Sequence, residues 1–217
     1  MARNTHILHV PVISQKTDHE CGNTVLTSVL QYLGKRCSVK EVYEWSNTTK
    51  DGTDHKDMIA GGVKAGATVF ARSGGGQKAL REVLEIVSYG IPVICGWWSM
   101  GPREKFGDVG VDYDKNWDLK KKIDGDCGHY SVLRGYTPST LLFMDPQDGV
   151  RGDNIGYCEY SDDEWLRIWY DTDTDAYELV RNWYMAVNFD GRRFAKELGA
   201  GEDFPPAQKK GAARQAD

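Results

Sequence analysis

Three residues of this chain have side chains that could together carry out nucleophilic thiol chemistry. Cys21 stands where a helix is expected to begin, and the free N–H groups and the dipole of a helix start stabilise a thiolate. A nucleophilic thiol also needs a base within hydrogen-bond reach and a third group that orients the base. His129 and Asp145 fit these two roles. The sequence therefore predicts an active site with Cys21 as nucleophile, His129 as base and Asp145 as the orienting acid.

A β-hairpin is expected to hold the base beside its acid. Strands are predicted over residues 130–136 and 140–144, and the three residues between them, Thr-Pro-Ser, are typical of a tight turn. His129 stands at the start of the first strand and Asp145 at the end of the second. Because the turn is short, no flexible element separates the two side chains.

Helical spacing predicts the element that carries Cys21. Apolar residues share one helix face over residues 21–33, and Gly34 can end this helix. Other helices are expected over 39–45, 54–65, about 77–89 and after Ser161, and other strands over 67–71, 91–97 and 183–189. Capping boxes, Ser38 with Glu41 and Ser161 with Glu164, mark two of the helix starts. Helices precede an antiparallel sheet, so the expected fold class is α+β.

The domain organisation follows from length and composition. A chain of 217 residues with 40% apolar residues is typical of one globular domain, which we expect to span residues 1–198. The polar stretch over about 100–127 is too long for an ordinary connection and directly precedes His129, so it is interpreted as a lid insertion, or as an exposed insertion without function. Residues 199–217 have few large apolar side chains and are expected to be disordered.

The remaining cysteines and histidines are interpreted as structural. The cysteines are widely spaced and form no Cys-x-x-Cys pair, which argues against a disulfide framework and a zinc site. Three of them, Cys37, Cys95 and Cys158, are expected to be small buried hydrophobic residues. Four histidines lack an acid at a spacing comparable to that of His129 and Asp145, so they are expected to be surface or core residues: His6, His9, His19 and His55.

Two segments imitate cofactor or metal sites. The glycine run over 74–79 lies between a strand and a helix, but the next strand ends without the acid that would bind a ribose. The series Asp171, Asp173 and Asp175 resembles the start of a calcium loop, yet the glycine and the bidentate glutamate of such loops are replaced. We interpret this series as a solvated acidic turn, and expect no cofactor and no metal.

Charge and hydropathy limit the expected partners. The net charge of −5 gives no electrostatic reason to expect nucleic acid or an anionic membrane. The longest apolar stretch, over 91–98, is less than half of the roughly 18 residues that a membrane span needs. The N-terminus lacks the apolar region of a secretory signal. A cytoplasmic protein without a membrane segment is therefore expected.

Four short motifs follow one another along the chain. They lie at residues 15–22 (Gln-Lys-Thr-Asp-His-Glu-Cys-Gly), 30–34 (Leu-Gln-Tyr-Leu-Gly), 128–132 (Gly-His-Tyr-Ser-Val) and 144–146 (Met-Asp-Pro). In these motifs and their order, the chain resembles the papain-like cysteine peptidases that process bacteriocin precursors after a double glycine. The resemblance to these double-glycine leader peptidases covers roughly residues 11–170.

The resemblance implies a papain-like fold and a set of catalytic roles. Cys21 would be the nucleophile, His129 the general base and then acid, Asp145 the group that orients it, and Gln15 an oxyanion donor. The implied activity is cleavage of a peptide or amide bond through an acyl-enzyme thioester, without a cofactor, on a peptide or protein substrate. Transporter forms of the family carry membrane and ATPase domains that this sequence lacks, which leaves open whether a separate transporter is a partner.

Two other functions are compatible with this reading. An amine that replaces water as the acceptor would make the protein an acyltransferase or a transglutaminase-like enzyme. A catalytically silent module that binds a leader peptide would need no intact set of catalytic residues. The complete set, Gln15, Cys21, His129 and Asp145, argues against this last function.

Overall fold

The structure, a computed structural model, describes residues 3–98, 128–147, 156–173 and 178–191. The predicted lid over 100–127 and the predicted disordered tail over 199–217 lie outside these residues. The domain boundary at residue 198 therefore stays a prediction. None of the helices in the described part of the chain has the length and apolar character needed to cross a membrane.

The fold is built on a seven-stranded sheet whose pairings are all antiparallel. Its order is β2 (Thr68–Arg72), β9 (Tyr184–Asn188), β3 (Val93–Trp98), β4 (Gly128–Tyr136), β5 (Leu141–Met144) and β6 (Tyr157–Tyr160), and β1 (His6–Ile7) pairs with β4. β4 therefore lies in the middle of the sheet, with β3 and β5 as its neighbours.

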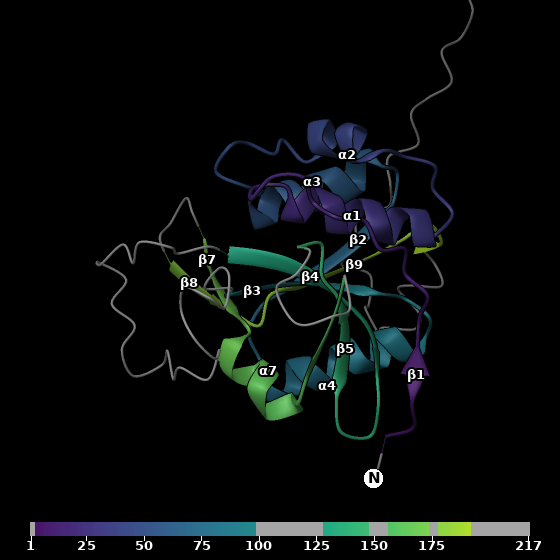
Figure 1. Ribbon diagram of the computed structural model, residues 1–217, viewed down its shortest axis with the longest axis vertical. Helices are drawn as coiled ribbons and strands as arrows, with labels where there is room; N and C mark the ends of the chain where they lie inside the picture. Colours follow the sequence, from purple (N-terminus) through teal and green to yellow (C-terminus); the bar gives the residue numbers. More distant parts are fainter. Residues whose placement is uncertain (1–2, 99–127, 148–155, 174–177, 192–217) are drawn as a thin grey trace, which may run out of the picture.

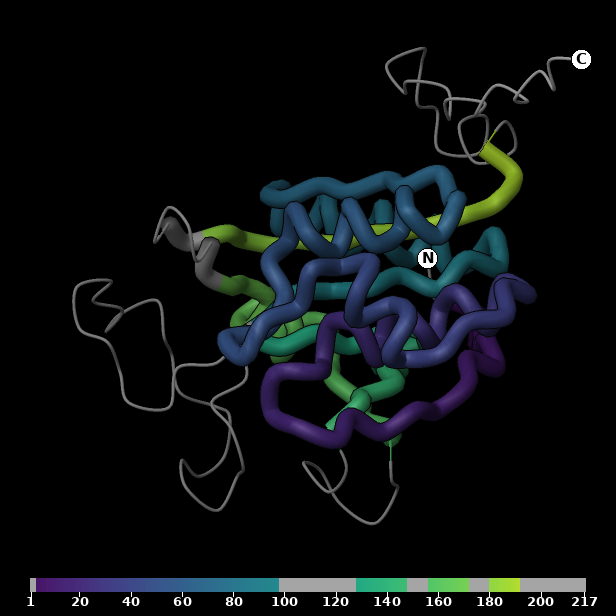
Figure 2. Tube along the Cα trace, turned by 90° about the horizontal axis from the view of Figure 1, so that it is seen from above, coloured from purple at the N-terminus to yellow at the C-terminus, as the bar shows by residue number. Residues whose placement is uncertain are grey.

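Helices cover the sheet from two sides (Figure 1). On one side lie α1 (Cys21–Tyr32), α2 (Val39–Trp45) and α3 (His55–Lys64), and on the other lie α4 (Gln77–Ser88) and α7 (Asp162–Ile168). Seen from above in Figure 2, the purple and blue segments of the first three helices lie across the strands. The predicted α+β class is confirmed.

Local sequence signals explain where several helices begin and end. Both predicted capping boxes form. The side chains of Ser38 and Ser161 each accept a hydrogen bond from the backbone N–H three residues later, and the carboxylate of the glutamate at that position accepts one from the backbone N–H of the serine. Gly34 and Gly90 follow α1 and α4 with φ of 85° and 83°, a left-handed conformation that glycine adopts without strain. The predicted helices over 21–33, 39–45 and 54–65 are thus confirmed to within a few residues.

An aromatic core fills the space between the sheet and α7. The rings of Phe143 and Trp165 lie 4.2 Å apart, and Trp165 also packs against Tyr160 and Trp169. Trp97 of β3 joins this cluster at 5.8 Å from Trp165. Since β3 and β4 are neighbours, the cluster supports the part of the sheet where β4 begins.

Some strands were not predicted from the sequence. These are β1, β6 and a separate two-stranded sheet of β7 (Tyr170–Asp173) and β8 (Glu178–Arg181). The interpretation of the aspartate series as a solvated turn is wrong for Asp171, which lies in β7 and is only 5% exposed. The side chain of Asp173 and residue Asp175 lie outside the described part.

Candidate active site

The start of α1 is left open for an anion. Cys21 is its first residue, and the N-cap residue Glu20 makes no side-chain capping bond. The carboxylate of Glu20 instead accepts a hydrogen bond from the N–H of Lys16, at 3.0 Å. The first turn of α1 holds no acidic residue, whereas those of α2 and α7 do. No acidic side chain of the first turn therefore competes with Cys21 for the free N–H groups at the start of α1.

Close packing fixes the start of α1 against β4. A Cβ atom on Gly22 would lie 2.9 Å from Sδ of Met58 and 2.9 Å from Cβ of Thr53, so a larger residue would force this contact apart. The carbonyl of Thr53 accepts a hydrogen bond of 3.0 Å from the hydroxyl of Tyr130, the residue after His129. Gly22 thus lets the start of α1 approach the segment of Thr53, which is hydrogen bonded to β4.

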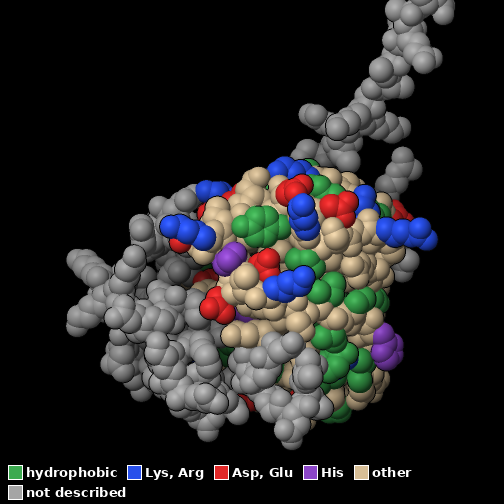
Figure 3. Space-filling view, turned by 45° about the horizontal axis from the view of Figure 1, so that its top comes forward, with side chains coloured by type: hydrophobic (Ala, Val, Ile, Leu, Met, Phe, Trp, Pro, Cys, Tyr) green, Lys and Arg blue, Asp and Glu red, His purple; other side chains and the backbone are tan. Residues whose placement is uncertain are grey.

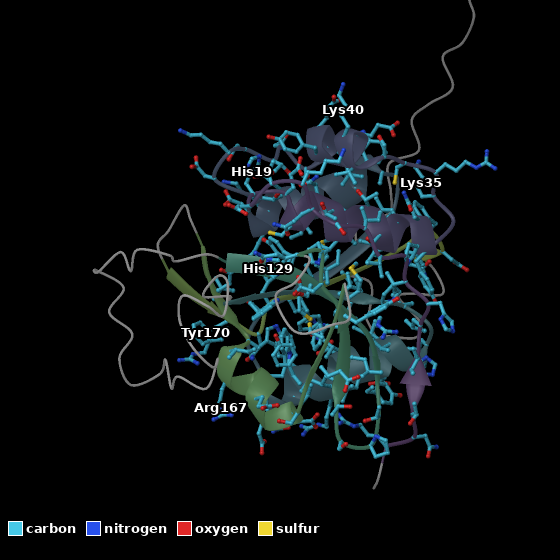
Figure 4. The ribbon with its side chains drawn as sticks, in the orientation of Figure 1. His19, Lys35, Lys40, His129, Arg167 and Tyr170 are labelled. Carbon is cyan, nitrogen blue, oxygen red and sulfur yellow. The ribbon has the colours of Figure 1, made fainter. Side chains whose placement is uncertain are left out.

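The predicted base and acid meet at the ends of β4 and β5. Nε2 of His129 lies 2.9 Å from Oδ1 of Asp145, and both residues are 5% exposed. A carboxylate can only accept a hydrogen bond, so Nε2 carries the proton. Nδ1 is then the nitrogen that remains for Cys21, whose thiol is a hydrogen-bond partner of His129. Figure 4 shows His129 in the sheet just below the layer of α1.

Charges within the site determine the protonation states. Burial alone would lower the pKa of His129, but the charge and hydrogen bond of Asp145, together with Cys21, raise it well above its ordinary value. Burial would raise the pKa of Asp145, yet His129 and the donors from Gln147 and Ser131 lower it below its ordinary value. The pair therefore favours an imidazolium on His129 beside an ionised Asp145.

Two further groups hold the carboxylate of Asp145. The N–H of Gln147 donates to Oδ1 and the hydroxyl of Ser131 donates to Oδ2, each at 2.9 Å. The sequence analysis did not identify these two groups. The available signal was spacing, because Ser131 stands two residues after His129 and so shares its face of β4.

Gln15 lies at the same end of the sheet. Its N–H donates to the carbonyl of Pro146 at 2.8 Å, which ties the segment before α1 to the residue after Asp145. Its side-chain Nε2 donates to the carbonyl of Thr17 at 3.0 Å. A primary amide has two N–H donors, so this bond leaves one of them for another acceptor.

His55 is partly buried, and an acid from a distant part of the chain lies next to it. Nε2 of His55 lies 3.4 Å from Oδ2 of Asp171. The ring stacks on Trp183 with 4.1 Å between ring centroids. The acid comes from β7, a strand that the sequence analysis did not predict. Figure 4 places His19, by contrast, in the helical layer above the sheet, where its ring bonds Thr17.

The glycine run before α4 has a structural role. The N–H of Gly76 donates to Oδ1 of Asn182 at 2.9 Å, and the N–H of Gly74 donates to the carbonyl of Arg181 at 2.6 Å. These two donors, which a phosphate would need, are already bonded to the segment between β8 and β9.

The other described cysteines lie in a different environment. Cys95 is fully buried, and this burial raises the pKa of its thiol well above the ordinary value. Cys158 is buried, whereas Cys37 is only partly buried, with its pKa raised mainly by burial. All three are free, as expected, although Cys37 is less buried than expected.

The surface over the helical layer has no concentration of one charge. Figure 3 shows lysine, arginine, aspartate and glutamate side chains interspersed on this face. Among the described residues no group of three or more His, Cys, Asp or Glu side chains could hold a metal ion.

Solved structures of peptidase domains share this fold. The peptidase domain of Streptococcus ComA, a bi-functional ABC transporter involved in quorum sensing, matches with a TM-score of 0.55 and 18% identity, over 83% of this chain and 98% of that domain. A putative C39-like peptidase from Bacillus anthracis matches with a TM-score of 0.58 and 16% identity, over 86% and 98% of the two chains.

A third structure, a double glycine motif protease from an AMS/PCAT transporter in complex with the leader peptide, matches with a TM-score of 0.51 and 16% identity, over 84% and 92% of the two chains. No curated protein matches significantly. A family model described as Peptidase_C39 like matches residues 7–176. This match spans well over half of the sequence. The chain therefore belongs to the Peptidase_C39-like family.

Proposed function

We propose that the protein is a cysteine peptidase that cleaves a peptide or amide bond through an acyl-enzyme thioester. Membership of the Peptidase_C39-like family supports a peptidase-type function. One observation carries the finer proposal: a buried hydrogen-bonded series runs from Cys21 through His129 to Asp145 at the open start of a helix. These are the nucleophile, the base and the orienting group that thiol catalysis requires.

Acylation would begin from the thiolate–imidazolium pair. The sulfur of Cys21 attacks the carbonyl carbon of the substrate, a C–S bond forms, and the electron pair of the C=O bond moves to oxygen. When this oxyanion collapses, the C–N bond breaks, and the imidazolium of His129 gives its proton to the leaving amine. The products of this step are a free amine and a thioester on Cys21.

Deacylation would use the same groups in reverse. Neutral His129 takes a proton from water, the hydroxide oxygen attacks the thioester carbon, and the C–S bond breaks as the second oxyanion collapses. The proton stays on the imidazole, which restores the thiolate–imidazolium pair. Asp145 keeps the ring in one tautomer throughout, because the ring nitrogen next to its Oδ1 is Nε2, which must carry a proton to bond a carboxylate.

Gln15 would donate to the oxyanion in both steps. The backbone N–H of Cys21 can supply one donor at the helix start, and a tetrahedral oxyanion usually has two. Gln15 has an N–H left over from its bond to Thr17, and its backbone is tied to the segment of Asp145. These bonds restrict the segment before any substrate binds, as an efficient oxyanion donor requires.

The proposed substrate is a peptide with a leader that ends in a double glycine. This proposal uses the likeness to the AMS/PCAT protease, which was solved with a leader peptide. The cytoplasmic location remains a prediction from the sequence.

The test is a search for an acyl adduct on Cys21 by mass spectrometry after the protein is mixed with peptides that contain Gly-Gly sites. We expect an adduct on Cys21 that is absent in Cys21→Ala and present in Cys95→Ala, the control at a buried cysteine. In H₂¹⁸O the released acid should gain one ¹⁸O. An amide product in the presence of amines would favour acyl transfer, and binding without any adduct or cleavage would favour a silent binding module.

A further inference from the structure

The carboxylate of Asp145 is held by more groups than the proposed mechanism uses. Oδ1 accepts from Nε2 of His129 and from the N–H of Gln147, and Oδ2 accepts from the hydroxyl of Ser131, each at 2.9 Å. Only the bond to His129 takes part in the reaction as derived above. Ser131 is 1% exposed, so its bond to Oδ2 is shielded from bulk solvent.

The hydroxyl of Ser131 can point in only one direction. Nε1 of Trp97 lies 2.9 Å from Oγ of Ser131, and an indole nitrogen is a donor only. Oγ therefore accepts from Trp97. Since the carboxylate of Asp145 is an acceptor only, Ser131 must direct its single proton to Oδ2. The chemistry of the two end groups thus fixes a directed series from Trp97 through Ser131 to Asp145.

The sheet places this series beside the catalytic pair. Trp97 of β3 is paired with His129 of β4, and the indole ring stands edge-on to the imidazole at a centroid distance of 5.5 Å. The pairing of Val132 with Met144 brings Ser131 opposite Asp145. Three adjacent strands therefore carry the series.

The far end of the series is anchored in the aromatic core. Trp97 is 2% exposed, and its ring packs at 5.8 Å from both Trp165 and Tyr160. A side chain that is enclosed in this way keeps its indole N–H in one direction. The core behind the sheet thereby sets the orientation of Ser131.

We propose that Ser131 is a positioning residue, which, held by Trp97, fixes the plane of the Asp145 carboxylate so that Oδ1 points at Nε2 of His129. This inference rests on the proposed function, because it concerns the same catalytic pair. A carboxylate held only through Oδ1 can rotate about its Cβ–Cγ bond, whereas a bond to Oδ2 prevents this rotation. Groups that orient a catalytic side chain in this way determine how closely it keeps its productive geometry.

Loss of the Ser131 hydroxyl would weaken the support that Asp145 gives to the imidazolium of His129. Without this donor the pKa of Asp145 rises, since Ser131 is one of the groups that lower it. A less well directed carboxylate also gives less support to the imidazolium, so the pKa of His129 falls toward its ordinary value. The imidazole would then lose its proton at a lower pH.

The test measures the rate at which iodoacetamide alkylates Cys21 across the pH range, with mass spectrometry to assign the site. Ser131→Ala should lower the maximal rate about tenfold, as expected for one hydrogen bond to a charged group, and should narrow the pH profile by moving its alkaline limb to lower pH. Ser131→Thr keeps the hydroxyl and should restore most of the parental profile. Ser28→Ala removes another fully buried serine hydroxyl, bonded to the carbonyl of Thr24 in α1, and should leave the profile unchanged.

Trp97→Phe provides a second variant that keeps an aromatic ring in the core but removes the indole N–H. It should lower the maximal alkylation rate by a smaller factor than Ser131→Ala, about threefold, because the hydroxyl of Ser131 is then free to turn. The pH profile should narrow as it does in Ser131→Ala. Thermal unfolding of each variant is measured in parallel, and profiles are taken only below the onset of unfolding.

The outcomes separate this inference from the proposed function. If parental Cys21 reacts no faster at neutral pH than the other cysteines of the folded protein, the proposed function fails. If parental Cys21 is fast and Ser131→Ala or Trp97→Phe keeps the parental profile, the positioning role is overturned and the function stands. Narrowing in Ser131→Thr equal to that in Ser131→Ala would also overturn it, because the hydroxyl would not be the cause.

Discussion

Two His–Asp pairs lie close to the same end of the sheet, one buried and one partly buried, and only the buried pair has the partners that thiol catalysis needs. In the pair of His129 and Asp145, the two side chains are 2.9 Å apart and both are hydrogen bonded. In the pair of His55 and Asp171, Nε2 and Oδ2 are 3.4 Å apart and Nε2 makes no hydrogen bond within the described residues. The imidazole of His55 instead stacks flat on Trp183, with 7° between the ring planes.

The difference teaches that an imidazole near a carboxylate needs further partners before it could act as the base of a thiol. His129 has an oriented acid on one nitrogen and Cys21 on its other side, whereas His55 lies against an indole face and the ring of Tyr130. The backbone of β4 brings the two His–Asp pairs next to each other. Gly128 precedes His129, and a Cβ atom there would collide with the carboxylate of Asp171. The pairs are therefore neighbours in space with separate roles.

Removing the nucleophile or the base should have the largest effect and should distinguish the two histidines at once. Cys21→Ala and His129→Ala should each lower kcat/KM by about 10⁶, the scale seen when either member of such a unit is lost. The double variant should lose little more, because the two groups act as one unit. Peptide cleavage measured for His55→Ala should stay close to the parental rate. Losses that multiply in the double variant would contradict the assigned roles.

Neutralising the acid of the catalytic pair should have the next largest effect. Asp145→Asn should lower kcat by about 10⁴, because the amide cannot hold the ring in the same tautomer. Asp145 raises the pKa of His129, and a raised histidine pKa keeps the imidazolium present until the pH rises through that value. In Asp145→Asn the alkaline limb of the Cys21 alkylation profile should therefore move to lower pH. An unmoved alkaline limb would show that Asp145 does not support the imidazolium.

The sequence was sufficient to predict the contact of His129 with Asp145, because local signals specify the two strands that bring these residues together. The turn over 137–139 gives the hairpin of β4 and β5, and the hairpin brings His129 to Asp145. Helix periodicity and Gly34 likewise define α1, which begins at Cys21. Each of these features depends on residues that are near one another in the chain.

The second pair could not be predicted, because its partners come from distant segments. His55 begins α3, whereas Asp171 lies in β7, whose sequence Tyr-Asp-Thr-Asp lacks the apolar alternation typical of a strand. β1 has two residues and forms only because β4 extends beyond its pairing with β3. Such contacts depend on the tertiary arrangement of the sheet rather than on local pattern.

A substitution at Gln15 should separate peptide cleavage, which forms an oxyanion, from alkylation of Cys21, which does not. Gln15→Ala should lower kcat by about 10² to 10³, the usual loss for one oxyanion donor. KM, the melting temperature and the alkylation rate of Cys21 should stay near parental values, since alkylation forms no oxyanion. Steady-state cleavage and iodoacetamide kinetics on the same preparation check this. A parental kcat would exclude the role, and a slow alkylation rate would indicate a disturbed site instead.

The smallest effect on catalysis is expected at the second pair. Asp171→Asn should change kcat/KM and the alkylation profile of Cys21 by less than about twofold, because the pair lacks a nucleophile and the stacking on Trp183 keeps His55 in place. The free energy of unfolding in urea should nevertheless fall by about 1–3 kcal/mol, since a buried charged acceptor is lost. Asp145→Asn is the matched substitution, made on an equally buried aspartate. If Asp171→Asn moved the alkaline limb as Asp145→Asn is expected to do, the contact through Gly128 would couple the two pairs, and their separation into a catalytic and a structural pair would be wrong.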